Sequence, residues 1–168
     1  MTNEDEVRWL DADQQDIWRS YLEGTARFVE ALESIHAAEL PLSLGEYGLL
    51  VKLSEQPDRT LRMSALADGL VVSRSRLSHT VARMEERGLV YRCAASGDRR
   101  GVNCRLTDAG YAALVDAAPG HVRAVRRLMV DVLEPEEFEV LGRVMAKVAA
   151  AGRAATEATG TPKGRTDC

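Results

Sequence analysis

Arginine side chains are concentrated in one short segment of the chain. Residues 73–105 contain eight arginines and no lysine against three acidic residues, which gives this segment a net charge of +5. The whole chain carries −4, so the residues outside the segment sum to −9. A guanidinium group presents a planar fork that matches phosphate oxygens and the edges of bases. A basic segment within an acidic chain predicts one surface that binds a polyanion.

The first half of this segment has the pattern of a helix with two different faces. On a helical wheel of about 100° per residue, Leu77, Val81 and Met84 form the apolar side of a helix over 74–87. The opposite side is small, polar and basic, and it carries Ser75, Arg76, His79, Ala82 and Arg83. Such a face suits the major groove of DNA, where its two arginines would reach guanine or phosphate. The alternative is a helix face that contacts only solvent.

The second half predicts a β-hairpin with arginines near its tip. Leu89–Cys93 and Val102–Leu106 have the character of strands, and turn-forming residues lie between them. Arg99 and Arg100 lie at or just past the tip, and an extended tip suits the narrow minor groove with its concentrated negative potential. Asp98 would accept hydrogen bonds from a neighbouring arginine and fix its direction. The alternative is ordinary turn chemistry for Asp98 and solvation of both arginines.

Helices on both sides must position this segment. A short helix followed at once by the arginine-bearing helix is the helix-turn-helix unit of many DNA-binding proteins. Pro119 and Gly120 should kink or briefly break a later helix, and the chain from Arg153 onward is predicted to be a disordered tail. The expected helices are a long one from Asp11 or Asp13 to Pro41, one capped by Ser43 and Glu46, a short one over Met63–Leu70, the one over 74–87, a long one from Thr107 and a last one from Pro135.

The composition excludes several classes of protein. With 168 residues, 45% hydrophobic and 29% charged, the chain has the size and balance of one globular domain with an appendage. Its apolar runs are far shorter than the about 20 residues that span a bilayer, so no membrane partner is expected. The acidic start of the chain lacks the apolar stretch of a secretory signal. Three scattered cysteines do not make a disulfide framework, so we expect a reducing cytoplasm.

The sequence predicts no catalytic residues, no metal site and no cofactor. It contains no phosphate-binding loop, no dinucleotide-binding glycine motif, no nucleophile elbow and no zinc-protease motif. His36, His79 and His121 are isolated and lack the spacing of metal ligands. A helical dimer that binds only proteins is a rival hypothesis, but such a protein would not need an arginine-bearing hairpin.

Two motifs at the right mutual spacing resemble those of the MarR family of regulators. The stretch from Ser73 to Val90, SRSRLSHTVARMEERGLV, resembles the recognition-helix segment of that family. The stretch from Asp98 to Gly110, DRRGVNCRLTDAG, resembles its wing signature, D-x-R followed by L-T-x-x-G. The resemblance covers about residues 8–150. Cys104 replaces the usual aliphatic residue of the second wing strand, and Glu134 replaces the common threonine before Pro135.

The resemblance implies a mainly α fold with a small β wing. This is a winged helix-turn-helix with long N- and C-terminal dimerisation helices. It divides the chain into a leader and dimerisation helix (1–42), a DNA-binding domain (43–110), C-terminal dimerisation helices (111–153) and a disordered tail (154–168). It further implies a homodimer that binds double-stranded DNA at a pseudo-palindromic operator, most often as a repressor.

The resemblance also assigns roles to individual residues. The wing arginine Arg100 would enter the minor groove, braced by Asp98, while Arg99 would contact a phosphate. The residues expected to contact the major groove or its borders are Ser73, Arg74, Ser75, Arg76, Ser78, His79 and Arg83.

Regulation is the remaining implication of the resemblance. A small aromatic or anionic effector would bind between the dimerisation helices and the DNA-binding domain, lined by Trp18, Tyr21, His36 and Tyr47, although core packing is the favoured role for each. A redox-sensing regulator is the alternative. Cys93 and Cys104 are equidistant from the hairpin centre and would then face each other, although two small apolar strand residues is the favoured interpretation. The helix at the start of the chain has no cysteine, whereas peroxide sensors of this family keep their reactive thiol there.

Overall fold

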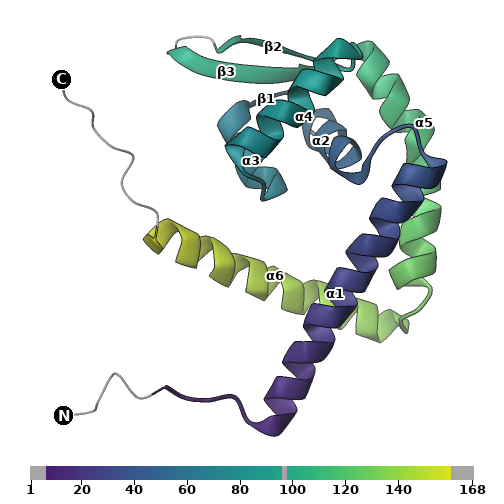
Figure 1. Ribbon diagram of the computed structural model, residues 1–168, viewed down its shortest axis with the longest axis vertical. Coiled ribbons are helices and arrows are strands. Elements are labelled where there is room, and N and C mark those ends of the chain that lie inside the picture. Colours follow the sequence, from purple (N-terminus) through teal and green to yellow (C-terminus); the bar gives the residue numbers. More distant parts are fainter. Residues whose placement is uncertain (1–6, 96–97, 160–168) are drawn as a thin grey trace. The chain divides into compact units, whose positions relative to one another are not determined.

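The computed structural model describes residues 7–95 and 98–159, with the side chains of 98–100 left undescribed (Figure 1). The chain divides into two compact units, one ending at Leu128 and the other beginning at Met129. The elements of the first unit are α1 (Ala12–Glu39), α2 (Leu44–Ser54), β1 (Thr60–Arg62), α3 (Met63–Leu70), α4 (Arg74–Glu86), β2 (Val90–Ala95), β3 (Asp98–Leu106) and α5 (Asp108–Val125).

Helix starts agree with the sequence because side chains cap them. The side chains of Asp11 and Ser43 accept hydrogen bonds from the backbone N–H groups of Gln14 and Glu46. The side chains of Gln14 and Glu46 in turn accept from the backbone N–H groups of Asp11 and Ser43, which completes a capping box at each helix start. Ser73 caps α4 by accepting from the Arg76 N–H, and Thr107 caps α5 in the same way. These local contacts confirm the predicted beginnings of four helices.

The sheet has three antiparallel strands in the order β1-β3-β2. The hairpin of β2 and β3 is the predicted wing, and both strands are longer than expected, because Ala95 and Asp98 are still paired. The strand β1 was not predicted. It is three residues long and pairs Thr60 with Arg105 and Arg62 with Asn103. The small sheet on an otherwise helical unit confirms the predicted fold class.

One apolar core joins the elements around α4. Its members come from α2, α3, α4, the wing and α5, and Leu77, Val81 and Met84 supply the α4 side, as the wheel predicts. The helix α5 also packs against α1 and α2. The core therefore fixes the orientation of α4 and leaves its other side exposed.

The start of α5 is locked to the turn between α4 and the wing. The Thr107 hydroxyl lies 2.7 Å from the Gly88 carbonyl oxygen and also accepts from the Gly110 N–H at 2.9 Å. A Cβ placed on Gly110 would lie 2.0 Å from the Leu89 carbonyl oxygen, so only glycine permits this approach. The L-T-x-x-G motif thus has a mechanical role, because it sets where α5 leaves the wing.

The predicted interruption of α5 is wrong. The helix runs without a break through Pro119 to Val125, and a π-helical segment, Arg126–Val130, follows it. Val115 and Pro119 are both exposed, so the carbonyl that loses its helical N–H partner lies on the solvent side. A Cβ on Gly120 would lie 2.3 Å from Leu40 Cδ2, so this glycine permits a close approach of the end of α1.

The second unit contains the helix α6, Pro135–Thr159. Its beginning is capped by the Glu137 carboxylate, which accepts from the Glu134 N–H at 2.9 Å. The helix continues through residues 154–159, which we expected to belong to a disordered tail, because an alanine-rich sequence favours helix there. The other predicted tail residues, 160–168, lie outside the described ones.

Candidate nucleic-acid interface

The exposed face of α4 carries the predicted recognition residues. Arg74, Ser75, Arg76, Ser78, His79 and Arg83 are all exposed, and so is the capping residue Ser73. The guanidinium groups of Arg74, Arg76 and Arg83 on this helix have no hydrogen bond or ion pair with another described residue. Small side chains between free guanidinium groups leave room for close approach to a grooved polyanion. The structure thus leaves all seven residues exposed along α4 and at its N-cap.

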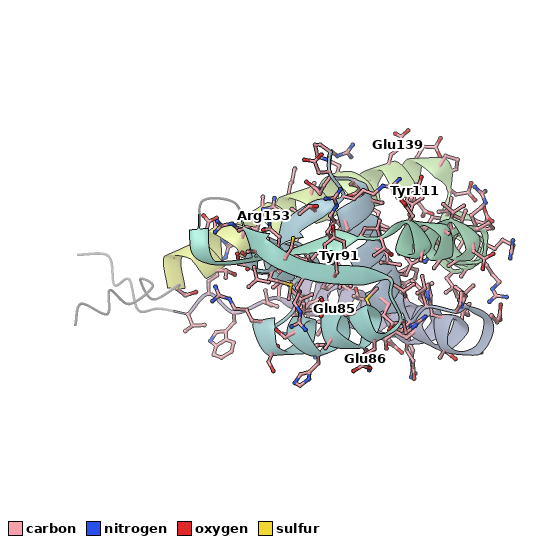
Figure 2. All side chains as sticks on the ribbon, turned by 90° about the horizontal axis from the view of Figure 1, so that it is seen from above. Glu85, Glu86, Tyr91, Tyr111, Glu139 and Arg153 are labelled. Atoms are coloured by element: carbon pink, nitrogen blue, oxygen red, sulfur yellow. The ribbon has the colours of Figure 1, made fainter. Side chains whose placement is uncertain are left out.

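Two of the eight arginines of the basic segment have a structural role instead. Arg92 donates from its backbone N–H to Glu85 Oε1 at 2.6 Å and from Nε to Glu85 Oε2 at 2.7 Å. Burial alone would raise the pKa of Glu85, but the hydrogen bonds and charge of Arg92 outweigh it and lower that pKa. Glu85 lies on the side of α4 toward the wing, whereas Glu86 points away from it (Figure 2). This pair therefore fastens α4 to the wing strand β2.

The other structural arginine, Arg87, fastens the end of α4 to the start of α2. Its guanidinium donates to Glu46 Oε1 at 3.1 Å and to the Pro41 carbonyl oxygen at 3.0 Å. Burial raises the pKa of Glu46, but hydrogen bonds from Ser43 and then the charge of Arg87 lower it overall. Arg87 and Arg92 belong to the basic segment that was predicted to bind a polyanion. The structure corrects this prediction, because ion pairs with Glu46 and Glu85 occupy both side chains.

The wing residues Asp98, Arg99 and Arg100 begin the strand β3. The Asp98 backbone pairs with Ala95, so the three residues directly follow the hairpin tip. Their side chains lie outside the described part of the chain, and their contacts stay a prediction.

The redox alternative requires Cys93 and Cys104 to face each other across the wing, and the strand pairing does not bring them together. Cys93 is opposite Asn103 and Cys104 is opposite Arg92, so the two cysteines are one position out of register. A shift of one residue turns two side chains to opposite faces of a sheet. Cys104 is fully buried, and burial raises the pKa of its thiol to about 12. The redox alternative therefore loses the arrangement on which it depended.

Comparison with known proteins gives a consistent match. A family model described as "MarR family" matches residues 40–101. The curated regulator PecS of Dickeya dadantii is 31% identical over 107 residues, which are 61% of this chain and 64% of PecS. The chain therefore spans slightly less than two thirds of that relative.

Solved structures extend the match over most of the chain. Sco3205 of Streptomyces coelicolor, a MarR family transcriptional regulator solved in complex with DNA, is 45% identical with a TM-score of 0.82. The match covers 88% of this chain and 92% of Sco3205. The chain belongs to the MarR family of transcriptional regulators. AbsC, another family member from Streptomyces coelicolor, is 37% identical with a TM-score of 0.80 over 88% of this chain and 99% of AbsC.

Membership of the MarR family confirms the winged helix-turn-helix fold and the assignment to transcriptional regulators rather than enzymes. No helix among the described residues has the length and apolar character needed to cross a membrane. Among the same residues, no three His, Cys, Asp or Glu side chains gather as metal ligands would.

The four predicted effector-lining residues form two separate pairs in this MarR-family chain. Trp18 and Tyr21 stack on α1 with ring centroids 5.6 Å apart, and both are exposed. His36 and Tyr47 are buried, with centroids 5.5 Å apart. At about 1.5 Å per residue, Trp18 and His36 are roughly 27 Å apart along α1. A small ligand bound within one protomer would contact one pair and not both.

The sequence predicts that His36 and His121 are isolated, but in the structure they contact each other. His36 Nε2 lies 3.0 Å from His121 Nδ1, and His36 Nδ1 lies 2.9 Å from the Leu42 carbonyl oxygen. Because a carbonyl only accepts, His36 Nδ1 carries a proton, and in the neutral pair His121 Nδ1 donates to His36 Nε2. Tyr47 stacks on His121 at 4.2 Å between centroids. The cluster joins α1, α2 and α5, and the two histidines are 85 positions apart, so no local pattern in the sequence indicated it.

Stability is expected to fall as the pH drops below about 6.5, the ordinary pKa of a histidine side chain. Burial, and then charge on His36, lower the pKa of His121 below its ordinary value. The unfolded chain therefore binds a proton at a pH where the folded chain does not, and falling pH favours unfolding. One such group contributes at most about 1.4 kcal/mol per pH unit. Thermal unfolding at fixed protein concentration measures the effect.

Two variants test whether His121 is the source of this pH dependence of stability. His121→Gln should make the pH dependence shallower, whereas His79→Gln, on the exposed face of α4, should leave it unchanged. An equally steep dependence in both variants would contradict the role of His121.

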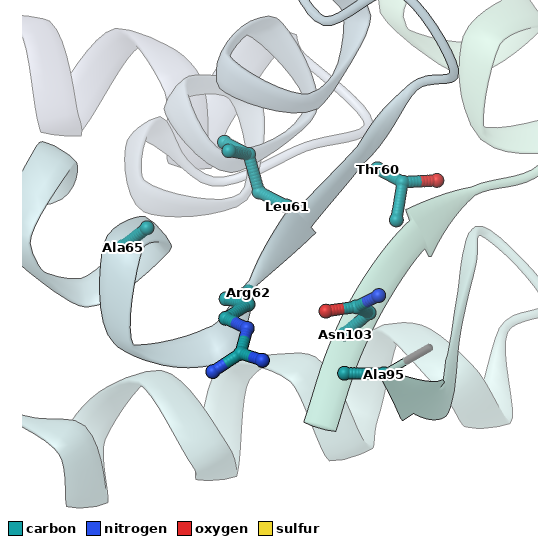
Figure 3. Close-up of a pocket in the computed structure, with 6 residues that line it drawn as sticks. All are labelled: Thr60, Leu61, Arg62, Ala65, Ala95 and Asn103. Atoms are coloured by element: carbon teal, nitrogen blue, oxygen red, sulfur yellow. The ribbon is translucent and has the colours of Figure 1, made fainter. Parts of the chain in front are cut away.

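An open pocket of about 410 Å³ lies at the surface of the first unit, beside β1 and the wing (Figure 3). It is lined by Thr60, Leu61, Arg62, Ala65, Ala95 and Asn103. None of the four predicted effector-lining residues lines it, so it lends no support to the predicted effector site.

Proposed function

We propose that this MarR-family regulator binds a pseudo-palindromic operator as a homodimer, with α4 of each protomer in the major groove. The observation that carries the proposal is the exposed surface of α4. There, three arginines whose guanidinium groups have no hydrogen bond or ion pair with a described residue lie beside small polar side chains. The core below and the pairs Glu85–Arg92 and Arg87–Glu46 hold this face rigid. A rigid polar helix suits direct contact with base edges.

Within this face, position along α4 divides the roles. Residues in the first turns of a recognition helix reach the bases, so Ser75, Arg76 and His79 are the base-contacting residues. Arg74 lies close to the apolar side of the helix and Arg83 lies in its last turn, so both suit phosphate contacts. Ser73 and Ser78 would donate their hydroxyl hydrogens to the backbone of the DNA. Ser73 Oγ already accepts from the Arg76 N–H, which leaves its own hydrogen free for this.

The wing supplies the second contact in this proposal. Arg100 would enter the minor groove, Asp98 would brace it and Arg99 would bind a phosphate. Their place in β3, directly after the hairpin tip, supports this assignment, because an extended strand end fits a narrow groove.

Homodimer formation is supported by apolar side chains left exposed on the long helices of each unit. On α1, Ile17 is 70% and Trp18 50% exposed, and on α6, Phe138 is 40% and Val148 51% exposed. Stripes of this kind on a soluble chain mark an interface. A second copy would cover them and place two α4 helices one turn of the duplex apart.

The biological setting follows from the same proposal. Repression is the proposed outcome, because a homodimer bound over a promoter would block access of the polymerase, and the cytoplasm is the proposed location. Release by a small aromatic or anionic effector is proposed from family membership. The two aromatic pairs, Trp18–Tyr21 and His36–Tyr47, are the residues to vary in testing it.

Arg76→Ala is expected to weaken operator binding about 5- to 150-fold for each half-site, because each protomer loses one bidentate base contact. The probe is a labelled duplex selected by the wild-type protein from a random pool, and fluorescence anisotropy gives Kd. Arg123→Ala removes the same charge from an exposed site on α5 and should change Kd little. An equal loss in both variants, or an equal loss for Arg76→Ala on unselected DNA, would reject base recognition by this face.

A further inference from the structure

Two helices of the DNA-binding unit end in the same backbone motif with different residues at its centre. At the end of α4, the Gly88 N–H donates to the Glu85 carbonyl and the Leu89 N–H to the Met84 carbonyl. At the end of α3, the Val71 N–H donates to the Asp68 carbonyl and the Val72 N–H to the Ala67 carbonyl. Both are Schellman motifs, whose central residue must adopt a left-handed conformation.

The left-handed residue is Gly88 at the end of α4 and Val71 at the end of α3. Gly88 has φ +69°, whereas Val71 has φ 54° and ψ 43°. A β-branched residue there is a steric outlier, because its Cβ crowds the carbonyl oxygen that follows. The Val71 side chain is 91% exposed, so packing within the described chain does not compensate for this strain. Strain that the fold does not need is characteristic of functional positions.

The place of Val71 in the chain indicates what it would contact. It lies two residues before Ser73, the N-cap of α4, between the two helices of the helix-turn-helix. The proposed docking inserts this end of α4 into the major groove. There, Arg74 and Arg76 would supply the charge that binds the DNA, while Val71 adds an exposed apolar group beside them.

We propose that Val71 is a specificity-determining residue that contacts the C5-methyl group of a thymine in the operator. In the major groove, that methyl group is the distinctive apolar feature of the base edges, and small apolar side chains recognise it. The contact would account for a valine at a position where glycine would relieve the strain. This inference rests on the proposed function, because it requires α4 to enter the major groove.

The test removes the methyl group and the side chain in turn. Each thymine of the selected duplex is replaced singly by deoxyuridine, which lacks only the C5-methyl, and Kd is measured for wild type and for Val71→Gly. At one thymine in each half-site, wild type should lose about three- to fivefold in affinity, roughly the effect of one buried methyl group. Val71→Gly, which removes the contact in both half-sites, should bind the thymine duplex about 9- to 25-fold more weakly and lose nothing further with uracil, which is the signature of a direct pair.

Further variants separate the contact from effects on folding. Val71→Gly and Val71→Asn both accept a left-handed backbone, so they should raise Tm by roughly 2–4 °C while they weaken binding. Val71→Ile keeps an apolar branched group and should keep the sensitivity to uracil. Equal affinities of wild type and Val71→Gly, or uracil effects of the same size in both, would overturn the inference and leave the proposed function standing. If wild type selects no duplex at all, the proposed function fails and this inference fails with it.

Discussion

Gly110→Ala is expected to lower the free energy of unfolding by about 3 kcal/mol, at the upper end of what overpacking costs. The added Cβ would lie 2.0 Å from the Leu89 carbonyl oxygen and 2.7 Å from Leu106 Cδ1. The first neighbour is backbone and belongs to the turn that holds α4 to the wing, so it yields only if that turn moves. Tm should fall by roughly 10 °C. Urea unfolding and calorimetry at one fixed protein concentration measure both quantities.

A matched control shows that the loss comes from the close approach. Gly45→Ala makes the same change in α2, where the added Cβ would have no neighbour within 4 Å. Alanine favours helix there, so this variant should be as stable as wild type or up to about 1 kcal/mol more stable. If Gly110→Ala unfolds at the same urea concentration as wild type, α5 is not locked to the turn as described.

Arg100→Ala is expected to weaken binding to the selected operator about 100-fold, or roughly 2.7 kcal/mol, while the dimer stays intact. A guanidinium in the minor groove is held by focused negative potential and by direct contacts with base edges. Both are lost with the side chain, and the rest of the wing remains. Anisotropy titrations give the affinity, and sedimentation gives the oligomeric state.

Arg99→Ala is the neighbouring control with the same change of charge. If Arg99 contacts a phosphate in each half-site, Arg99→Ala should weaken binding about tenfold on every duplex and reduce the salt slope by about two, one for each protomer. The loss from Arg100→Ala should shrink on unselected DNA. Equal losses from the two variants on both kinds of duplex would show that Arg100 binds the backbone and does not read sequence.

Local chemistry accounts for most of what the sequence predicts. The caps Asp11, Ser43 and Ser73 and the C-terminal Gly88 act within a few residues, so helix ends could be read without knowing the fold. The wheel of α4 separates Leu77, Val81 and Met84 from the polar face because one period of 3.6 residues governs the whole helix. The arginine-bearing face was predictable for the same reason.

Features that depend on distant partners could not be predicted. The strand β1 is three residues long, and only its pairing with β3 makes it a strand. The pairing of β2 with β3 differs by one residue from the pairing in which Cys93 would face Cys104. A bulge between Ala94 and Ala95 sets this pairing. His36 and His121 meet through packing of α1 on α5, which nothing near either residue reveals.

The number of arginines in a segment of sequence does not show which of them are free to bind DNA. Arg87 and Arg92 look like Arg76 and Arg83 in the sequence, yet ion pairs with Glu46 and Glu85 occupy them. A count of charges in a segment therefore overstates the surface available to a polyanion. The pairs stiffen the unit that presents the remaining arginines, so their contribution to DNA binding is indirect.

The dependence of operator affinity on salt is the most direct test of the account. Arginines that neutralise phosphates release counterions, so log Kobs falls with log salt by about 0.9 for each phosphate contacted. With two protomers on the duplex, we expect a slope steeper than about −3 for wild type, reduced in Arg99→Ala and unchanged in Arg123→Ala. A flat salt dependence, or no association with any duplex at low ionic strength, would contradict the conclusion that α4 and the wing form a DNA-binding surface.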